Sequence, residues 1–118
     1  MNLTQIIGNL GDDPQFKDFG NGNSCSNFNV AVSDITKNKA GEMVKTTEWF
    51  KCTAWNKTAG FINQNVKKGC KVYVSGRLKS RNYTDQSGAN KTVTELIVDR
   101  LELLTWPTQN GKHLSDNR

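Results

Sequence analysis

The sequence KKGCKVYVSGRLKSRNYTDQSGANKTVTELIV, at residues 67–98, has the pattern of a long β-hairpin and decides the fold of the chain. In its first half, aliphatic residues at even positions alternate with polar residues and tyrosines at odd positions, as in a strand whose two faces differ. The even set is Val72, Val74 and Leu78, and the odd set is Tyr73, Ser75, Arg77, Lys79, Arg81 and Tyr83. Turn-forming residues at 85–90 predict the turn of the hairpin, and β-branched residues at 92–98 predict its second strand. We expect the even set to pack and the odd set to be exposed.

The odd-numbered face combines cations with aromatic rings. Arg and Lys side chains neutralise phosphates, while ring faces stack on bases. Basic residues are also concentrated in the middle of the chain: residues 45–81 contain nine Lys or Arg and one acidic residue, Glu48, whereas the whole chain has a net charge of +5. This local excess predicts a surface that binds a polyanion such as nucleic acid, and the alternative is a basic face that contacts only solvent.

Composition limits the function classes further. At 118 residues the chain has room for one domain, and it contains no apolar run near the roughly 20 residues that span a membrane. Its cysteines, Cys25, Cys52 and Cys70, are widely spaced without a C-x-x-C pair, so neither a zinc site nor a disulfide framework is indicated. The only histidine, His113, lies in a polar C-terminal segment. We therefore expect a cytoplasmic protein with no membrane span, no enzymatic activity, no metal and no cofactor.

The residues before the hairpin predict further strands and one helix. Strands are expected at 3–10, 24–33 and 46–55, with a short extended piece at 15–19. The polar segment 34–45 is expected to be a long, mobile loop.

Residues 56–68 predict the helix, because apolar residues recur there at helical spacing. Asn56 or Thr58 can cap its start, and Gly69 stands where a left-handed C-terminal cap is wanted.

Alternation assigns faces to the two strands before this helix. In the strand at 24–33, Phe28, Val30 and Val32 are expected in the core. In the strand at 46–55, one face has Phe50, Cys52 and Ala54, and the other has Trp49, Lys51, Thr53 and Trp55. Large aromatic residues are usually buried, so the tryptophans could be core residues. Their shared face with a lysine favours exposed rings that stack on bases.

The order of elements is strand, strand, strand, helix, strand, strand, with all strands able to pair antiparallel. This order is typical of the five-stranded Greek-key barrel called the OB-fold, an all-β class with one short helix. The OB-fold domain is expected at residues 1–104, and residues 105–118, which lack periodicity, are expected to form a short flexible C-terminal tail. The fold alone does not assign a function.

Several short motifs follow one another along the chain in a specific order. They are I-x-G-N-L-G-x-D-P at residues 6–14, N-G at 21–22, G-E-M at 41–43, T-E-W at 47–49, K-T-A at 57–59, K-G-x-x-V-Y-V-x-G-x-L at 68–78 and Y-T-D-Q-S-G at 83–88. In order and spacing they resemble the bacterial single-stranded DNA-binding proteins, and the resemblance covers Asn2 to about Leu104.

This resemblance implies an OB-fold that assembles as a homotetramer and binds single-stranded DNA without sequence preference or a cofactor, protecting it during replication, recombination or repair. It assigns base stacking to Trp49, Trp55 and Tyr83. Together with the odd-numbered face of the hairpin, it predicts nine nucleic-acid-binding residues: Trp49, Lys51, Trp55, Lys57, Lys68, Arg77, Lys79, Arg81 and Tyr83. Leu3, Ile6 and Ile7 are expected to form an exposed apolar face that supports the tetramer.

Three features depart from the family pattern. Ile35 and Thr36 stand where family members often have an aromatic residue, so weaker binding is expected there. Phe50 replaces a histidine that some members use near subunit contacts. The segment 105–118 has Asp116 as its only acidic residue. It therefore lacks the acidic tip through which most members recruit protein partners, and those partners are not expected.

Two other functions remain open on the sequence. One is a small nuclease on the same fold, although Asp12, Asp13 and Asp34 lie in predicted turns without a metal-binding or general-base arrangement. The other is a replication-restart or accessory OB-fold subunit that acts mainly as a protein adaptor, against which the paired tryptophans argue.

Overall fold

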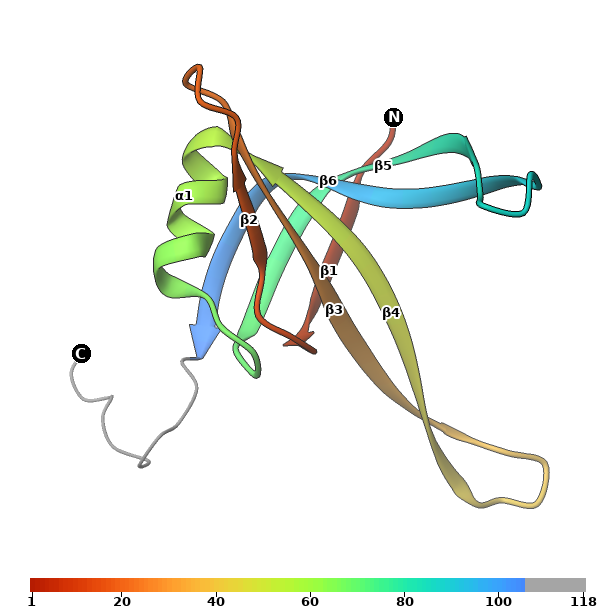
Figure 1. Cartoon of the computed structure of the whole chain (residues 1–118). Coiled ribbons are helices and arrows are strands. Elements are labelled where there is room, and N and C mark those ends of the chain that lie inside the picture. The colour runs from red at the N-terminus through yellow and green to blue at the C-terminus, as the bar shows by residue number, and fades with distance from the viewer. Residues whose placement is uncertain (106–118) are drawn as a thin grey trace.

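The computed structural model describes residues 1–105, which form a small barrel from which two hairpins project (Figure 1). The strands are β1 (Thr4–Leu10), β2 (Gln15–Asp18), β3 (Ser24–Lys37), β4 (Met43–Trp55), β5 (Lys71–Thr84) and β6 (Asn90–Thr105). The helix α1 (Asn56–Asn65) lies between β4 and β5 in the chain. The prediction of a flexible tail falls on residues 106–118, which lie outside the described residues.

Pairing of β1 with both β5 and β3 closes the barrel. The strand order is β1-β5-β6-β4-β3-β2, and the additional β1–β3 pairing leaves β2 attached only to β3. The predicted five-stranded OB-fold is confirmed. Antiparallel pairing throughout is wrong, because β4 and β6 are parallel where Cys52 pairs with Leu96 and Thr53 with Ile97. A closed barrel with an odd number of strands cannot alternate direction at every pair, so one parallel pair is required.

The core fills the barrel with side chains from all five barrel strands and from α1. Its buried members are Ile6, Leu10, Phe28, Val30, Cys52, Ala54, Ile62, Val66, Cys70, Val72, Val74, Leu96 and Val98. The predicted burial of Phe28 and Val30 is confirmed, while Val32 is only half-buried against this core. α1 contributes by packing against β3 and β4.

The apolar face predicted for the first strand is partly wrong. Ile6 points into the barrel and is 8% exposed, because the inward positions of β1 are the even-numbered ones. Leu3 and Ile7 are exposed as predicted, at 59% and 50%. The exposed apolar face at this end of the molecule is therefore smaller than the sequence suggests.

The alternation of β5 breaks at a register shift between Ser75 and Gly76. Ser75 is buried although its odd position predicts exposure, and Leu78, predicted to pack, is 40% exposed. A Cβ atom at position 76 would lie 1.9 Å from the carbonyl oxygen of Ile97, so glycine is required for this close approach. Beyond the shift β5 leaves the barrel, and residues on both of its faces are exposed.

α1 is shorter than predicted and is capped differently. Trp55 is its N-cap residue without a side-chain hydrogen bond, so neither Asn56 nor Thr58 caps it. Asn56 has a φ of 53°, and its Oδ1 instead accepts a hydrogen bond from the backbone N–H of Ser24 at 3.0 Å. Gly69 has the left-handed backbone that was expected, with φ 90°, but in a turn beyond the helix. Among residues 1–105, no helix is long and apolar enough to cross a membrane.

Two hairpins project from the barrel, and one of them differs from the prediction. We define the β3–β4 arm as residues 33–47 and the β5–β6 arm as residues 77–97 (Figure 1). The segment 34–45, predicted as a loop, is mostly strand, and only residues 38–42 lie between β3 and β4. Its polar sequence fits a strand because both faces of an arm contact solvent, so no apolar alternation is needed.

Candidate nucleic-acid interface

A groove lies between β4 and the base of the β5–β6 arm, and we name it the arm groove. Its volume is about 480 Å³. Its lining residues are Thr53 and Trp55 of β4, Arg77, Lys79 and Arg81 of β5, and Glu95 and Ile97 of β6. The parallel contact between β4 and β6 brings these strands side by side. One tryptophan and three cations of the predicted site therefore share one groove.

A second groove, the strand groove, runs along β3 and β4 and has a volume of about 370 Å³. Its lining residues are Asp12, Asp13, Gln15, Asn27, Phe28, Asn29, Lys51, Arg81 and Glu95. Because Arg81 and Glu95 line both grooves, the two grooves adjoin. The strand groove contains the predicted Lys51, but its aspartates make it less basic than the arm groove.

Arg81 stands at the junction of the grooves and contacts two neighbours. Its guanidinium forms an ion pair with Glu95 across the arm at 3.2 Å, and it lies 6.0 Å from the centre of the Tyr83 ring. The Arg81 side chain is 58% exposed, whereas that of Glu95 is 14% exposed. The carboxylate therefore pairs with the guanidinium at the junction of the grooves and offsets part of its charge.

The two tryptophans of β4 are exposed, as predicted. Trp49 is 60% exposed and Trp55 is 47% exposed, so neither is a core residue. The indole ring of Trp49 packs against Gly11, where a Cβ atom would lie only 2.5 Å from the ring. Thr53, placed on the same predicted face, is buried instead, and its hydroxyl donates a hydrogen bond to Oδ1 of Asn27 at 2.9 Å.

Lys57 and Lys68 are exposed but line neither groove. Lys57 lies in the first turn of α1. Lys68 lies before β5, where its backbone N–H donates a hydrogen bond to the Asp13 carboxylate at 2.8 Å. The grooves therefore unite Lys51, Trp55, Arg77, Lys79 and Arg81, and leave Trp49, Lys57, Lys68 and Tyr83 outside them.

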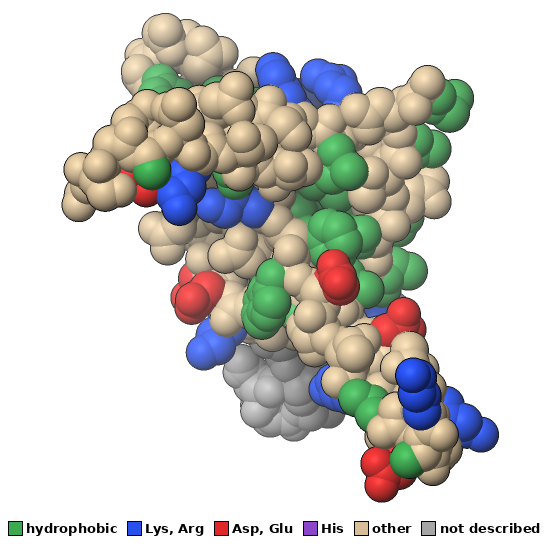
Figure 2. Space-filling model, turned by 90° about the vertical axis from the view of Figure 1, so that its right-hand side faces the viewer, with side chains coloured by type: hydrophobic (Ala, Val, Ile, Leu, Met, Phe, Trp, Pro, Cys, Tyr) green, Lys and Arg blue, Asp and Glu red, His purple; other side chains and the backbone are tan. Residues whose placement is uncertain are grey.

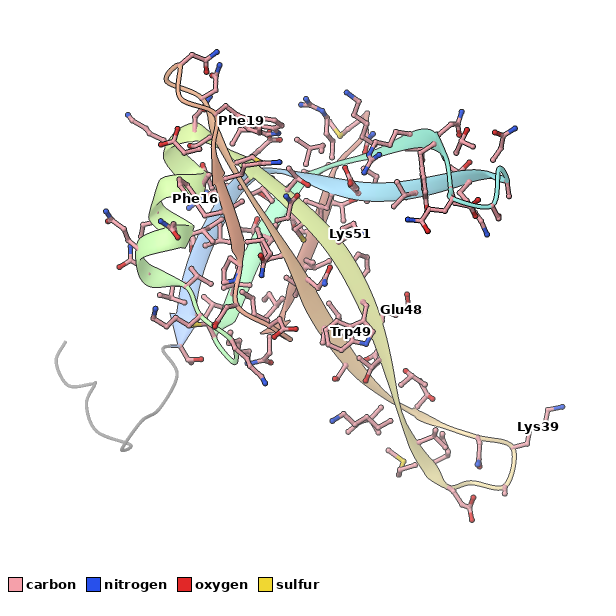
Figure 3. All side chains as sticks on the ribbon, viewed as in Figure 1. Phe16, Phe19, Lys39, Glu48, Trp49 and Lys51 are labelled. Carbon is pink, nitrogen blue, oxygen red and sulfur yellow. The ribbon has the colours of Figure 1, made fainter. Side chains whose placement is uncertain are left out.

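Two residues beside these grooves, Glu95 and Phe19, are not among those predicted from the sequence. Glu95 lines both, and its alternation with Leu96 and Val98 on β6 would have placed it on the exposed face. Phe19 lies against Trp55, with ring centroids 6.1 Å apart and planes 22° from parallel. No sequence pattern links these two rings, because their contact depends on strands that are far apart in the chain. Figure 3 shows Phe19 near the end of β2 and Lys51 along β4.

Cys25, Cys52 and Cys70 are free and buried. Burial raises the pKa of the Cys52 thiol to about 12, so this thiol stays protonated at neutral pH. In the part of the chain up to Thr105, no three His, Cys, Asp or Glu side chains gather as a metal-ligating group.

Figure 2 shows the side of the molecule from which both arms project. Blue Lys and Arg side chains lie beneath the arm at the upper left and along the arm at the lower right, with green hydrophobic side chains between them. Cations and aromatic rings on one face of a five-stranded barrel define the class of OB-fold proteins that bind oligonucleotides.

The chain belongs to the single-strand binding protein family, whose model matches residues 1–104. It is 36% identical over 112 residues to single-stranded DNA-binding protein 1 of Chlorobaculum tepidum, covering 94% of this chain and 69% of the relative. It is also 36% identical over 107 residues to the single-stranded DNA-binding protein of Bacteroides thetaiotaomicron, covering 89% of this chain and 66% of the relative. The chain thus spans about two thirds of the length of these relatives.

A solved structure also resembles the barrel. The structure described as the Plasmodium falciparum SSB complex with ssDNA has a TM-score of 0.83 to this chain at 24% identity. The match covers 89% of this chain and 96% of that one. At this level of identity the likeness supports the fold.

Proposed function

We propose that this protein binds single-stranded DNA without sequence specificity and protects it during replication, recombination or repair. The observation that carries the proposal is the arm groove, where Trp55 faces Arg77, Lys79 and Arg81. Family membership and the printed names of the relatives support the choice of single-stranded DNA as the ligand. The adjoining strand groove adds Lys51 to the same surface.

In the proposed mechanism, aromatic rings bind the bases and cations bind the phosphates. Bases stack on the exposed faces of Trp49, Trp55 and Tyr83. This stacking tolerates any base sequence, because every base has a π-face. Lysine and arginine side chains neutralise the phosphates between those bases. Duplex DNA binds less well because its base faces are already stacked. The protein acts by binding, without an enzymatic step or a cofactor, and works in the cytoplasm.

Tryptophan fluorescence tests this proposal. Oligo(dT) should quench the emission strongly, and Trp49→Ala or Trp55→Ala should each weaken binding by about 1–3 kcal/mol, the value of one base–aromatic stack. Phe61→Ala is a matched control because Phe61 is an exposed ring on α1, away from both grooves. Normal affinity in both folded tryptophan variants would refute the stacking mechanism.

We also propose that the protein assembles as a homotetramer. Family membership supports this proposal, as do two exposed apolar residues: Ile7 on the outer face of β1 and Leu3 just before that strand. A tetramer lets one DNA strand pass over several OB-fold modules, each of which binds about 4–16 nucleotides. Light scattering should give roughly four times the 13.2 kDa chain mass. A monomer at micromolar concentration would contradict this assembly.

A further inference from the structure

Three residues near the β2 end of the sheet order form a second aromatic and cationic group, which we name the edge cluster: Lys17 on β2, Phe19 after β2 and Trp55 on β4. The Phe19 and Trp55 rings are stacked 6.1 Å apart, and both side chains are 47% exposed. The Lys17 ammonium lies 5.8 Å from the centre of the Phe19 ring. A cation and two half-exposed rings therefore meet at one place on the surface.

Strand pairing fixes the position of this cluster. Lys17 of β2 pairs with Cys25 of β3, and Cys25 pairs with Trp55 of β4. Lys17 and Trp55 therefore lie in line across the sheet, with Cys25 between them. The turn after β2 is closed by a hydrogen bond from the Phe19 N–H to the Asn23 carbonyl oxygen at 2.9 Å. This turn holds the Phe19 ring at the level of Trp55.

The strand order places Phe19 on the opposite side of Trp55 from the arm cations. β6 lies on one side of β4, while β3 and then β2 lie on the other. Arg77 and Lys79 line the arm groove with Trp55 from the β5–β6 side, and Phe19 contacts Trp55 from the β2 side. The edge cluster thus continues the arm groove past Trp55, towards β2.

We propose that Lys17 and Phe19 form a further subsite for single-stranded nucleic acid, occupied by the nucleotide next to the one stacked on Trp55. This inference rests on the proposed function. A centroid separation of 6.1 Å leaves no space for a base between the rings, so the base stacks on the Phe19 face over which the ammonium lies. Lys17 then leaves the ring and pairs with the adjacent phosphate, since an exposed cation–π contact is weak. Phe19 thereby supplies a further stacking ring beside Trp55.

The competing explanation is that Phe19 only supports the Trp55 ring. Two substitutions separate these roles: Phe19→Leu keeps an apolar contact with Trp55 but removes the aromatic face, and Phe19→Ala removes both. Phe61→Leu is the matched control, because Phe61 is 42% exposed on α1. Oligo(dT) of about 4 to 16 nucleotides, the range of one OB-fold, is titrated into each folded variant.

If the edge cluster is a subsite, both Phe19 variants lose affinity about fivefold or more for the longer oligonucleotides, as expected for one lost stack. They keep the affinity of the wild type for the shortest ones that bind. Lys17→Ala should make the slope of log K against log salt shallower by roughly 0.7. Normal binding by Phe19→Leu at every length, or equal losses at every length, would overturn the proposal. Absence of oligo(dT) binding by the wild type would instead refute the proposed function.

Discussion

The two arms are both antiparallel hairpins, yet their side chains stabilise them differently. The β5–β6 arm is linked across its strands by contacts between Ser80 and Thr94 (3.0 Å), Arg81 and Glu95 (3.2 Å), Asn82 and Thr92 (2.8 Å), and Thr84 and Asn90 (3.3 Å). Within residues 33–47, side-chain bonds across the arm join the Thr46 hydroxyl to the Asp34 carbonyl oxygen at 3.4 Å and, at the tip, the Asn38 amide nitrogen to the Glu42 carboxylate at 3.2 Å. We infer that the β5–β6 arm is the stiffer of the two.

Their cations are also placed differently. Arg77, Lys79 and Arg81 lie at the base of the β5–β6 arm and line a groove that contains a tryptophan. The lysines of the β3–β4 arm lie along its length and at its tip, where Figure 3 labels Lys39, and they line neither groove. Three cations on each arm can therefore be compared, and their roles are expected to differ, because Arg77, Lys79 and Arg81 line a groove with an exposed ring and the three lysines of the β3–β4 arm do not.

The largest expected effect separates the two sets of cations. Substituting Arg77, Lys79 and Arg81 by Ala should weaken oligo(dT) binding roughly 100-fold at 0.1 M salt and make the salt slope shallower by about 2, since each lost phosphate contact removes about 0.7. Substituting Lys37, Lys39 and Lys45 removes the same charge and should cost less than about fivefold. Salt titrations of both triple variants decide between them. Equal losses would mean that total charge, and not the groove, determines affinity.

A smaller effect is expected from Glu95, which neutralises part of the charge of Arg81 on the stiffer arm. Glu95→Gln should tighten oligo(dT) binding about 1.5- to 5-fold, because an exposed ion pair is worth roughly 0.2–1 kcal/mol and must be broken before Arg81 meets a phosphate. Glu48→Gln is the matched control, since Glu48 is exposed on β4 outside both grooves. Weaker binding by Glu95→Gln would show instead that the carboxylate holds Arg81 in its binding position.

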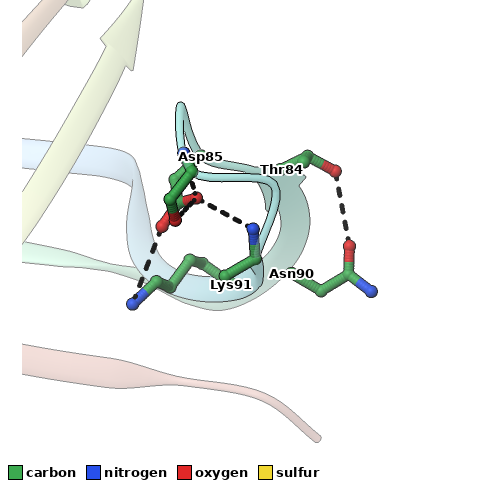
Figure 4. A network of polar contacts seen from close by, with 6 residues as sticks. Thr84, Asp85, Asn90 and Lys91 are labelled. Atoms are coloured by element: carbon green, nitrogen blue, oxygen red, sulfur yellow. Dashed lines mark hydrogen bonds and ion pairs between the residues drawn. The ribbon is translucent and has the colours of Figure 1, made fainter.

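The smallest expected effect is a difference between the two arm tips in how their stability depends on pH. At the β5–β6 tip the Asp85 carboxylate accepts hydrogen bonds from the Ser87 hydroxyl and from the Ala89 N–H, and it pairs with Lys91 (Figure 4). These bonds, led by that of Ser87, lower the pKa of Asp85 below its ordinary value of 3.8. At the β3–β4 tip the corresponding acceptor is the neutral amide of Asn38.

Because folding lowers the pKa of Asp85, its stabilisation of the turn is complete above pH 3.8 and is lost as the pH falls through the lowered pKa. Amide exchange at residues 86–89 should therefore speed up in acid, while exchange at the Ala40 and Glu42 N–H groups should change less, because their direct acceptor is the neutral Asn38 amide. Asp85→Asn should remove this difference. Equal acid sensitivity at the two tips would contradict the role given to the carboxylate.

The parts of this fold that the sequence could predict are those in which one face is buried. Alternation placed Phe28, Val30, Val72 and Val74 inside the barrel because a period of two is enforced wherever one side of a strand packs. Alternation failed at Leu78, where a register shift moves the strand out of the barrel. It also failed for the segment 34–45, where both faces are exposed and apolar residues are not required.

The candidate site divides in the same way. Trp49, Lys51 and Trp55 could be placed on one face from their spacing, because they belong to one strand. The groove itself could not be predicted, since it arises where β4 meets β6 in the closed barrel. The stacking of Phe19 on Trp55 and the pairing of Arg81 with Glu95 were likewise invisible, because each joins residues from different strands through their exact register.

The short parallel joint between β4 and β6 also bears on how the protein folds and opens. It pairs Cys52 with Leu96 and Thr53 with Ile97, residues 44 positions apart, whereas each arm forms between neighbours in the chain. Distant contacts carry a larger loop-closure cost, so we expect the two hairpins to form first and this joint to close late. Opening of the joint in the native state takes the arm groove apart while both hairpins stay paired. A DNA strand bound across Trp55 and the arm cations would therefore stabilise the closed barrel against this opening.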